Sequence, residues 1–279
     1  MKDVTGKVAF ITGGASGMGL GMARAFGAAG MKVMIGDIEQ GPMEKAVAEL
    51  KDKGIEAAGI VVDVADRDSV FAAADATIEA FGKVHVLCNN AGIGVTGKSE
   101  KCSVENWQWV MDVNLWGVVY GLQAFMPLIE SHGEEGHVMS TASMAGMVSF
   151  RYMGPYNATK FAVVTLMETM MEEHREDNIG VSVLCPGIVA TNIASGTRNR
   201  QERYGGQREA RDQELNEEML GAGLDPDIVG EQVLEAIIDD APYIFTDPTM
   251  RRFIDKRFAR ISAGYDWADN CKALKKAAL

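Results

Sequence analysis

The sequence predicts an α/β protein built on a doubly wound parallel sheet of about seven strands with helices on both faces. Short apolar runs without polar alternation, such as residues 7–12 and 32–37, indicate strands buried on both faces. Longer amphipathic segments separate these runs and indicate helices. The repeated strand–helix order then favours parallel strands joined by right-handed crossovers.

Each strand run leads through a short connection into a helical segment. From the apolar runs we expect strands at 7–12, 32–37, 55–62, 84–89, 137–140, 180–185 and 243–246. From the amphipathic segments we expect helices at 17–29, 42–53, 66–81, within 103–131, at 155–176 and at 225–239. A basic helical stretch opens at Pro248 and is expected to run to Arg260.

Segment 192–223 interrupts this alternation. It is rich in Arg, Glu, Gln and Gly and poor in large apolar residues. A long insertion within a compact domain is usually functional or disordered, and we expect this one to be a lid over a substrate. No linker-like boundary is present, so residues 1–279 are expected to form one domain with a C-terminal extension at about 263–279.

The composition excludes several classes of protein. The formal net charge of −12 disfavours nucleic acid and membrane surfaces as partners, and no apolar run approaches the ~18–20 residues of a membrane span. The N-terminus does not resemble a secretory signal. Four distant cysteines indicate reduced thiols and a cytoplasmic location. The four histidines lack metal-ligand spacing, so we expect no metal and place them at the surface or an interface: His85, His132, His137 and His174.

A glycine-rich turn follows the first strand. It reads Thr12-Gly13-Gly14-Ala15-Ser16-Gly17-Met18-Gly19. A phosphate at a helix N-terminus needs free backbone N–H groups and no obstructing Cβ. Gly13 permits the tight turn, Gly17 lets the backbone approach a pyrophosphate, and Gly19 allows close helix packing. With Ser16 and Met18 beside them, these glycines predict a Rossmann-like dinucleotide site.

Polar residues follow the next three strands. Asp37 lies about 20 residues beyond the glycines, where a carboxylate can accept hydrogen bonds from ribose hydroxyls. It would repel a 2′-phosphate, and no cation stands at Ala15 or Ser16, so NAD is favoured over NADP. Asp63-Val64 and Asn90 follow the third and fourth strands and could line the same crevice. The alternative for these two motifs is ordinary turn formation.

Tyr156 and Lys160 stand four residues apart, directly after Pro155, which fits the first turn of a helix. A free tyrosine has a pKa of about 10 and is a poor acid–base group at neutral pH. A neighbouring ammonium together with an oxidised nicotinamide would stabilise the phenolate. Ser143 precedes Tyr156 by 13 residues and could hydrogen-bond a substrate oxygen. Taken alone, a tyrosine–lysine pair at this spacing is common on any helix and indicates core packing with a solvated lysine.

These motifs occur in one order with Asn114 and with Pro186-Gly187-x-Val189-x-Thr191. Together they resemble the single-domain branch of the short-chain dehydrogenase/reductase family, closely over residues 5–195. The resemblance implies NAD as cofactor and a homodimer or homotetramer paired through helices in 103–131 and 155–176. It implies contacts to the adenosine half of NAD from Asp37, Asp63, Val64 and Asn90, and to the carboxamide end from Val189 and Thr191.

The resemblance also implies catalytic roles. Tyr156 would be the general acid/base, and Lys160 would hold the nicotinamide ribose and lower the Tyr156 pKa. Ser143 would orient the reacting oxygen, and Asn114 would anchor a water of a proton relay. The alternative for Asn114 is a buried helix residue that satisfies backbone groups.

Four stretches are similar to bacterial members of the family that oxidise benzylic alcohols of lignin-derived aryl compounds: 178–183, 192–195, 203–205 and 223–226. This implies an NAD-dependent dehydrogenase that interconverts a secondary alcohol and a ketone on a bulky or aromatic substrate. Alternatives are a steroid or alicyclic alcohol, a 3-hydroxyacyl group, a redox-neutral dehydratase or epimerase, and a catalytically silent NAD-sensing protein. Apolar residues that could contact the substrate are Met144, Met147, Met153, Trp107, Trp109, Phe150, Tyr152 and Tyr204.

Overall fold

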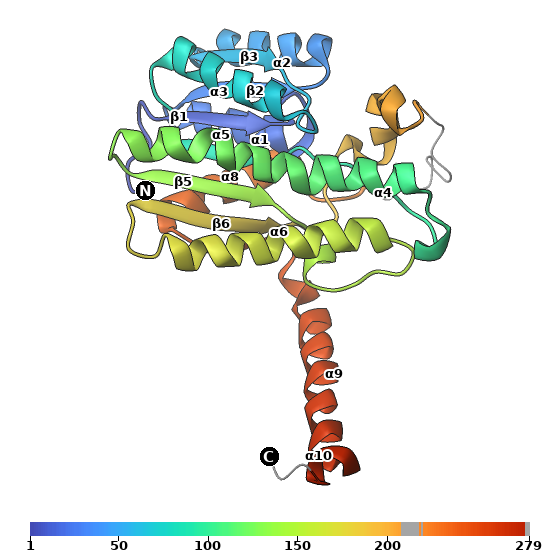
Figure 1. Ribbon diagram of the computed structural model, residues 1–279. Coiled ribbons are helices and arrows are strands. Elements are labelled where there is room, and N and C mark those ends of the chain that lie inside the picture. Colours follow the sequence, from blue (N-terminus) through green and yellow to red (C-terminus); the bar gives the residue numbers. More distant parts are fainter. Residues whose placement is uncertain (208–217, 219, 277–279) are drawn as a thin grey trace. The chain divides into compact units, whose positions relative to one another are not determined.

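The computed structural model of the chain describes residues 1–207, 218 and 220–276 (Figure 1). It divides into two compact units, one formed by Met1–Thr246 and one that begins at Asp247. The expectation of one domain over 1–279 stays a prediction.

The first unit is built on one seven-stranded sheet in which every pairing is parallel. The strand order is β3-β2-β1-β4-β5-β6-β7, so the order reverses between β1 and β4, which is where ligands bind in open α/β sheets. The predicted fold class is confirmed. The strand bounds are β1 Val8–Thr12, β2 Lys32–Asp37, β3 Ala57–Val61, β4 Val86–Asn89, β5 Gly136–Thr141, β6 Ile179–Cys185 and β7 Tyr243–Phe245.

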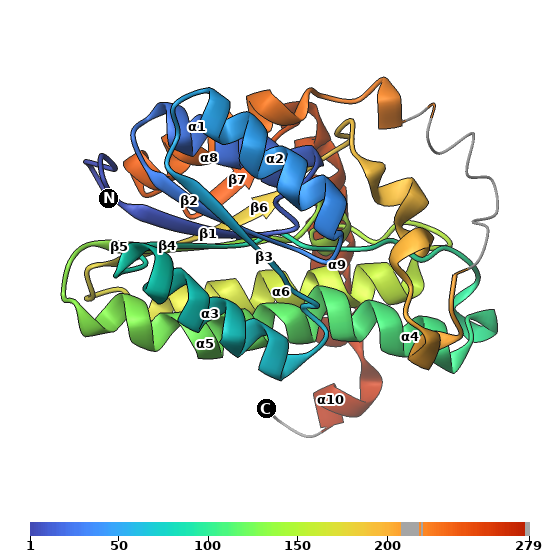
Figure 2. The ribbon, with the colours of Figure 1, turned by 90° about the horizontal axis from the view of Figure 1, so that it is seen from above.

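Helices cover both faces of the sheet (Figure 2). One face carries α1 Gly17–Ala28, α2 Gln40–Asp52 and α8 Pro226–Asp239. The other carries α3 Arg67–Phe81, α4 Val104–Met111, α5 Gly117–Ser131 and α6 Gly154–Glu173. Two apolar cores result, because the central strands bury side chains on both faces. Among the described residues, no helix combines the length and the apolar character that crossing a membrane requires.

The predicted long helix within 103–131 is interrupted by a π-helical segment, Asp112–Trp116, between α4 and α5. This wider turn contains Asn114, and π-turns inside helices often occur at functional sites. In the second unit the predicted basic helix is longer than expected. It continues as α9, Arg251–Asn270, past the predicted end at Arg260, and α10 follows at Lys272–Lys276.

The surface location expected for the histidines is wrong for His137 and His85, which are 0% and 4% exposed. His137 stands on β5 with its Nε2 2.8 Å from Ser182 Oγ. The Ser182 hydroxyl donates to the carbonyl oxygen of Ala241, so Nε2 donates to Ser182 and Nδ1 carries no proton. Nδ1 has no hydrogen-bond partner in the structure. Burial lowers the pKa of His137 to about 3.

This buried imidazole makes stability depend on pH. Between pH 3 and 6.5 the unfolded chain binds a proton that folded His137 does not, so stability rises with pH across this window. We expect the native protein to lose roughly 2–4 kcal/mol more unfolding free energy than His137→Gln between pH 7 and pH 4. Urea unfolding at both pH values measures the difference. Equal losses in the two proteins would contradict the prediction.

Candidate active site

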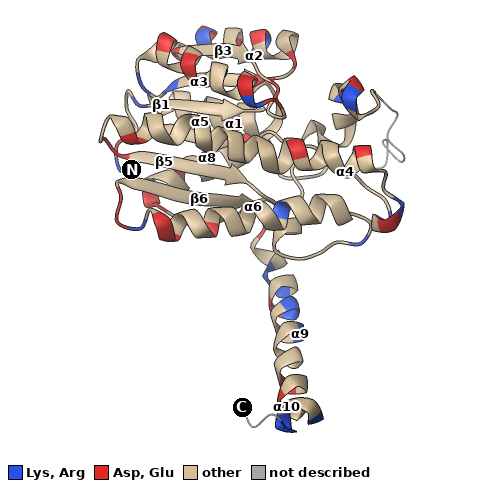
Figure 3. Cartoon of the chain, viewed as in Figure 1, with Lys and Arg blue, Asp and Glu red and all other residues tan. Residues whose placement is uncertain are grey.

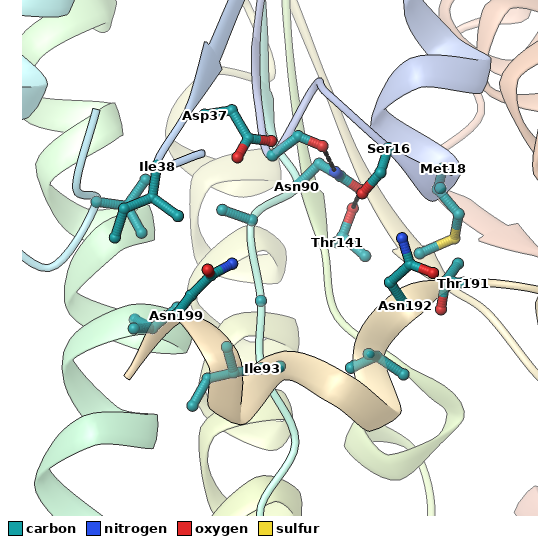
Figure 4. Close-up of a pocket in the computed structure, with 18 of the residues that line it drawn as sticks. Ser16, Met18, Asp37, Ile38, Asn90, Ile93, Thr141, Thr191, Asn192 and Asn199 are labelled. Atoms are coloured by element: carbon teal, nitrogen blue, oxygen red, sulfur yellow. Dashed lines mark hydrogen bonds between the residues drawn. The ribbon is translucent and has the colours of Figure 1, made fainter. Parts of the chain in front are cut away.

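A pocket opens at the carboxyl ends of the parallel strands (Figure 4). Residues that follow six successive strands of the sheet line it, and a segment after β6 covers it. The strand-end residues are Gly13 after β1, Asp37 at the end of β2, Asp63 after β3, Asn90 after β4, Thr141 at the end of β5 and Pro186 after β6. Because the strands are parallel, six loops distant in sequence converge on one crevice.

The glycine-rich turn forms the floor beside α1. Gly13 and Gly17 have φ angles of +63° and +50°, where a side chain would be strained. A Cβ on Gly19 would lie 2.1 Å from the carbonyl oxygen of Gly13, so only glycine allows the helix to start this close to the turn. Ser16 makes no side-chain cap and the first turn of α1 has no acidic residue. The backbone N–H groups at this helix start therefore fit a pyrophosphate.

Asp37 forms the end of the pocket next to β2 and is 8% exposed. Its Oδ2 accepts from the Ala15 backbone N–H at 3.0 Å and its Oδ1 from that of Glu39 at 3.0 Å. Burial raises the pKa of Asp37, and these backbone donors act in the opposite direction. The carboxylate is thus held in one orientation at the place where ribose hydroxyls were expected. These features fit a dinucleotide without a 2′-phosphate.

The catalytic residues expected from the sequence meet at the other end of the pocket. Ser143, just beyond β5, accepts from the Ala145 N–H at 3.0 Å and is hydrogen-bonded to the phenol of Tyr156 in the first turn of α6. Lys160 Nζ lies 5.6 Å from the centre of the Tyr156 ring and donates to the carbonyl oxygen of Thr141 at 2.8 Å. Lys160 is 2% exposed and Tyr156 8%.

Two opposing effects act on the pKa of Tyr156 in this structure. Burial raises the pKa of Tyr156, and the hydrogen bond from Ser143 acts in the opposite direction. Burial also lowers the pKa of Lys160 to about 8. The lowering of the Tyr156 pKa by Lys160 together with an oxidised nicotinamide stays a prediction.

Asn114 bridges two elements behind the pocket and is 1% exposed. Its Oδ1 accepts from the Ile93 N–H at 2.9 Å, and its Nδ2 donates to the Ile93 carbonyl at 2.9 Å and to Thr159 Oγ1 at 3.3 Å. The amide is therefore used by protein groups, as in the alternative interpretation, and its place in a proton relay stays a prediction.

The chain matches the family model of the short chain dehydrogenases over residues 7–202. It belongs to the short-chain dehydrogenase family. It is 38% identical to a C alpha-dehydrogenase of Sphingobium sp. strain SYK-6, over 94% of this chain and 87% of that protein. It is 32% identical to a CLA biosynthesis dehydrogenase/reductase of Lactiplantibacillus plantarum, over 94% of this chain and 95% of that protein. The chain is also similar to a short chain dehydrogenase/reductase from Burkholderia phymatum that was solved in complex with NAD. The two superpose with a TM-score of 0.91 at 36% identity, over 95% of this chain and 97% of that one.

The pocket brings together most of the residues predicted for this short-chain dehydrogenase. Those that line the pocket are Gly13, Ser16, Gly17, Met18, Asp37, Asp63, Val64, Asn90, Tyr156, Lys160 and Thr191. Gly19, Asn114 and Ser143 lie behind this lining, in contact with it. Val189 is buried and bridges to Leu224 without lining the pocket. Of the eight apolar candidates for substrate contact, Trp109 alone is among the lining residues.

The first part of the predicted lid lies over the pocket as two short 3-10 helices, Asn192–Asn199 and Glu202–Tyr204. Figure 4 shows Asn192 beside Thr191 and Met18, and Asn199 on the side of Ile38. Positions 208–217 and 219 of the predicted lid lie outside the described residues. The adenosine contact expected of Asp63 is untested, and its Oδ2 accepts from Gln201 at 3.0 Å and Arg203 at 2.9 Å.

Sequence reasoning missed a second lid contact. Arg198 binds Glu39 through two nitrogens, at 2.6 and 3.1 Å, and this pairing lowers the pKa of Glu39. Both residues line the pocket beside Asp37, so the guanidinium at this end is already paired with a carboxylate. The two residues are 159 positions apart, and no local pattern connects them.

Breaking this ion pair should loosen the lid. In Glu39→Gln the bidentate pair becomes a weaker neutral contact, so tryptic cleavage within 192–207 is expected to be about 3–5-fold faster. Timed digestion followed by mass spectrometry measures the cleavage rate. Glu44→Gln, an exposed substitution on the same helix α2, is the matched control. Equal rates in all three proteins would contradict a latching role.

A cluster at the opposite ends of the strands has metal-like spacing, contrary to the sequence expectation. His85, His132 and Glu134 bring ligand atoms within 4.8 Å of one another. However, Nδ1 of His85 accepts from the Val8 N–H, and Nδ1 of His132 accepts from the Glu134 N–H. Glu134 also binds two lysines, Lys7 and Lys83. These lone pairs are engaged, so the cluster is a hydrogen-bonded ion-pair group and not a metal centre.

Proposed function

We propose that the chain is an NAD-dependent oxidoreductase that interconverts a secondary alcohol and a ketone by hydride transfer. The observation that carries the proposal is the hydrogen-bonded Ser143–Tyr156 pair beside buried Lys160, at the inner end of the pocket. The other end carries the oriented carboxylate of Asp37. A catalytically silent NAD sensor would need the Asp37 carboxylate but not the Ser143–Tyr156 pair.

The roles of the side chains follow from their chemistry. NAD, when bound, accepts or supplies the hydride and in its oxidised form brings a positive charge. The glycine-rich turn would hold its pyrophosphate, and Asp37 its adenosine ribose. In the oxidation direction the Tyr156 phenolate takes the proton of the alcohol, and Ser143 orients the same oxygen. The Lys160 ammonium is fixed by Thr141 and favours the phenolate electrostatically.

The substrate that we favour is the benzylic alcohol of a lignin-derived aryl compound. The C alpha-dehydrogenase relative matches 94% of this chain, including the segment that covers the pocket. Trp109, Val113 and Ile193 supply apolar lining in the same pocket as Tyr156, which fits an aromatic ring better than a small polar alcohol. The proposed role of the enzyme is therefore in the metabolism of aromatic compounds.

We further propose a cytoplasmic homodimer or homotetramer. Trp116, 46% exposed, stacks on Tyr120 at 5.7 Å between ring centres, at the start of α5. Exposed aromatic pairs on a helix face favour burial against a partner. All four cysteines are free, which fits a reducing compartment.

The test is the appearance of reduced nicotinamide when the protein is mixed with NAD and a panel of secondary alcohols. The panel contains arylpropane benzylic alcohols, steroid alcohols and 3-hydroxyacyl compounds. We expect the fastest turnover with the benzylic alcohols and one equivalent of ketone for each NAD reduced. Turnover on another class alone would overturn the substrate assignment. Silence on all classes, with NAD binding demonstrated, would favour the sensor or a redox-neutral reaction.

A further inference from the structure

The C-terminal helix α9 carries a row of apolar side chains along one face. This α9 stripe consists of Ile254, Phe258, Ile261, Tyr265 and Ala268, at successive intervals of four, three, four and three residues. At about 100° per residue they stay within about 80° of the helix circumference. Such a narrow row with alternating intervals is typical of a helix-pairing seam.

Within the second unit the α9 stripe has no cover. No residue of α9 is buried, and Phe258, Ile261 and Tyr265 are 53%, 43% and 73% exposed. In proteins most of the stability of a helix comes from packing of its apolar face, and α9, with 20 residues, has no buried residue. Three large exposed side chains in one row, with the half-buried Ile254 beside them, therefore indicate a surface that is buried in a larger assembly.

The net charge of residues 247–279, which include α9, is opposite in sign to that of the rest of the chain. Residues 247–279 contain eight Lys and Arg against four Asp and Glu, a net charge of +4, whereas residues 1–246 carry −16. Figure 3 shows the Lys and Arg positions along α9. At about 100° per residue, Arg251 and Arg257 flank the α9 stripe on its two sides, while Arg252 lies on the opposite side of the helix. A basic rim around an apolar row suits an acidic protein surface.

We propose that the α9 stripe is a docking surface for a second copy of this chain. The acidic surface of residues 1–246 in the second copy supplies the complementary charge for Arg251 and Arg257. About half of the area of these side chains is still exposed, so two reciprocal contacts, with the partner surface that each stripe covers, remove on the order of 1,000 Å² from water. This is below the roughly 1,200–2,000 Å² of a standard interface and is typical of a weak association. This surface is separate from the α5 face of the proposed function.

Other partners fit less well. Two further exposed aromatic residues of α9, Phe253 and Trp267, lie beside the α9 stripe on one side of the helix, so the width of the apolar face does not exclude a membrane surface. The chain as a whole has a net charge of −12, which repels anionic lipid and nucleic acid. A second copy would cover the α9 stripe and also supply negative charge opposite Arg251 and Arg257.

The experiment compares the mass of the full-length protein and its variants by sedimentation velocity over a concentration series. Phe258→Glu places a charge in the α9 stripe, and Ala263→Glu places the same charge on the opposite, exposed side of α9. We expect Phe258→Glu to raise the dissociation constant of one association step about 100-fold and Ala263→Glu to change it less than 3-fold. Circular dichroism checks that both variants keep their helix content.

A second pair of variants tests the charge without altering the apolar row. Arg251→Glu is expected to weaken the same step about 10-fold, and the adjacent Arg252→Glu less than 3-fold. Identical mass distributions for the native protein and Phe258→Glu would overturn the proposal. So would binding to vesicles containing phosphatidylserine that is lost in Phe258→Glu without a change in mass. NAD reduction, assayed in parallel, reports on the proposed function independently.

Discussion

Replacing Tyr156 by phenylalanine is expected to lower kcat for alcohol oxidation by about 10²–10⁴-fold, the range that a positioned acid–base group contributes. The ring still fills its place at the start of α6, so the fold and the pocket are retained. What disappears is the oxygen that Ser143 bonds and that takes the proton of the alcohol. The NAD dissociation constant is expected to change by less than about 3-fold, because a lost transition-state contact lowers kcat without weakening ground-state binding.

Steady-state kinetics and NAD titration by fluorescence measure the two quantities separately. Tyr152→Phe is the matched control, since this phenol is 46% exposed, four residues before Tyr156, and outside the pocket lining. It is expected to keep at least half of the native kcat. Turnover of Tyr156→Phe within about 10-fold of the native rate would remove Tyr156 from the chemistry.

The same tyrosine sets the direction of the pH dependence. Oxidation needs the phenolate, so the rate of oxidation should rise with pH toward the raised pKa of Tyr156. Reduction of the ketone needs the protonated phenol and should fall over the same range. Lys160, with a pKa of about 8, loses its charge at higher pH and limits the rise in oxidation.

Replacing Asp37 by alanine is expected to lower the ratio of kcat/KM for NAD over NADP by about 10²-fold. A hydrogen bond to a charged group contributes about 1.5–3 kcal/mol, so NAD should lose about 10–100-fold in kcat/KM. NADP should gain, because the buried carboxylate no longer repels its 2′-phosphate. The substitution weakens cofactor binding and leaves the reacting groups unchanged, so kcat at saturating NAD should change little.

Kinetics with both cofactors measure this ratio. Asp37→Asn is the informative control, because it keeps an oxygen that can accept from Ala15 and removes the negative charge. We expect it to keep more NAD activity than alanine and to accept NADP. An unchanged NAD to NADP ratio in Asp37→Ala would show that the ribose lies elsewhere.

The sheet and most of the site could be predicted from the sequence because their signals are local. Apolar runs identify β1 and β2, and the glycine spacing identifies the turn that joins β1 to α1. The tyrosine–lysine spacing likewise places two side chains on one turn of α6. Since parallel strands end at the same edge, knowing the strand ends was enough to bring Asp37 and Asn90 into one pocket.

The contacts that the sequence did not predict join distant segments. Glu39 meets Arg198, and Asp63 meets Arg203, across more than a hundred residues with no intervening pattern. Buried His137 donates to the Ser182 hydroxyl, which in turn donates to the Ala241 carbonyl, and only the folded sheet brings these three residues together. Periodicity identifies which face of an element is buried, but it does not identify the partner of a single polar side chain.

The most direct test follows the hydrogen that the enzyme moves. A benzylic secondary alcohol carrying deuterium on its carbinol carbon is turned over with NAD, and the reduced nicotinamide is analysed by mass spectrometry. Direct hydride transfer predicts one deuterium in each reduced nicotinamide and one equivalent of ketone. Deuterium released to water, or kept in an organic product without accumulation of reduced nicotinamide, would contradict an alcohol dehydrogenase.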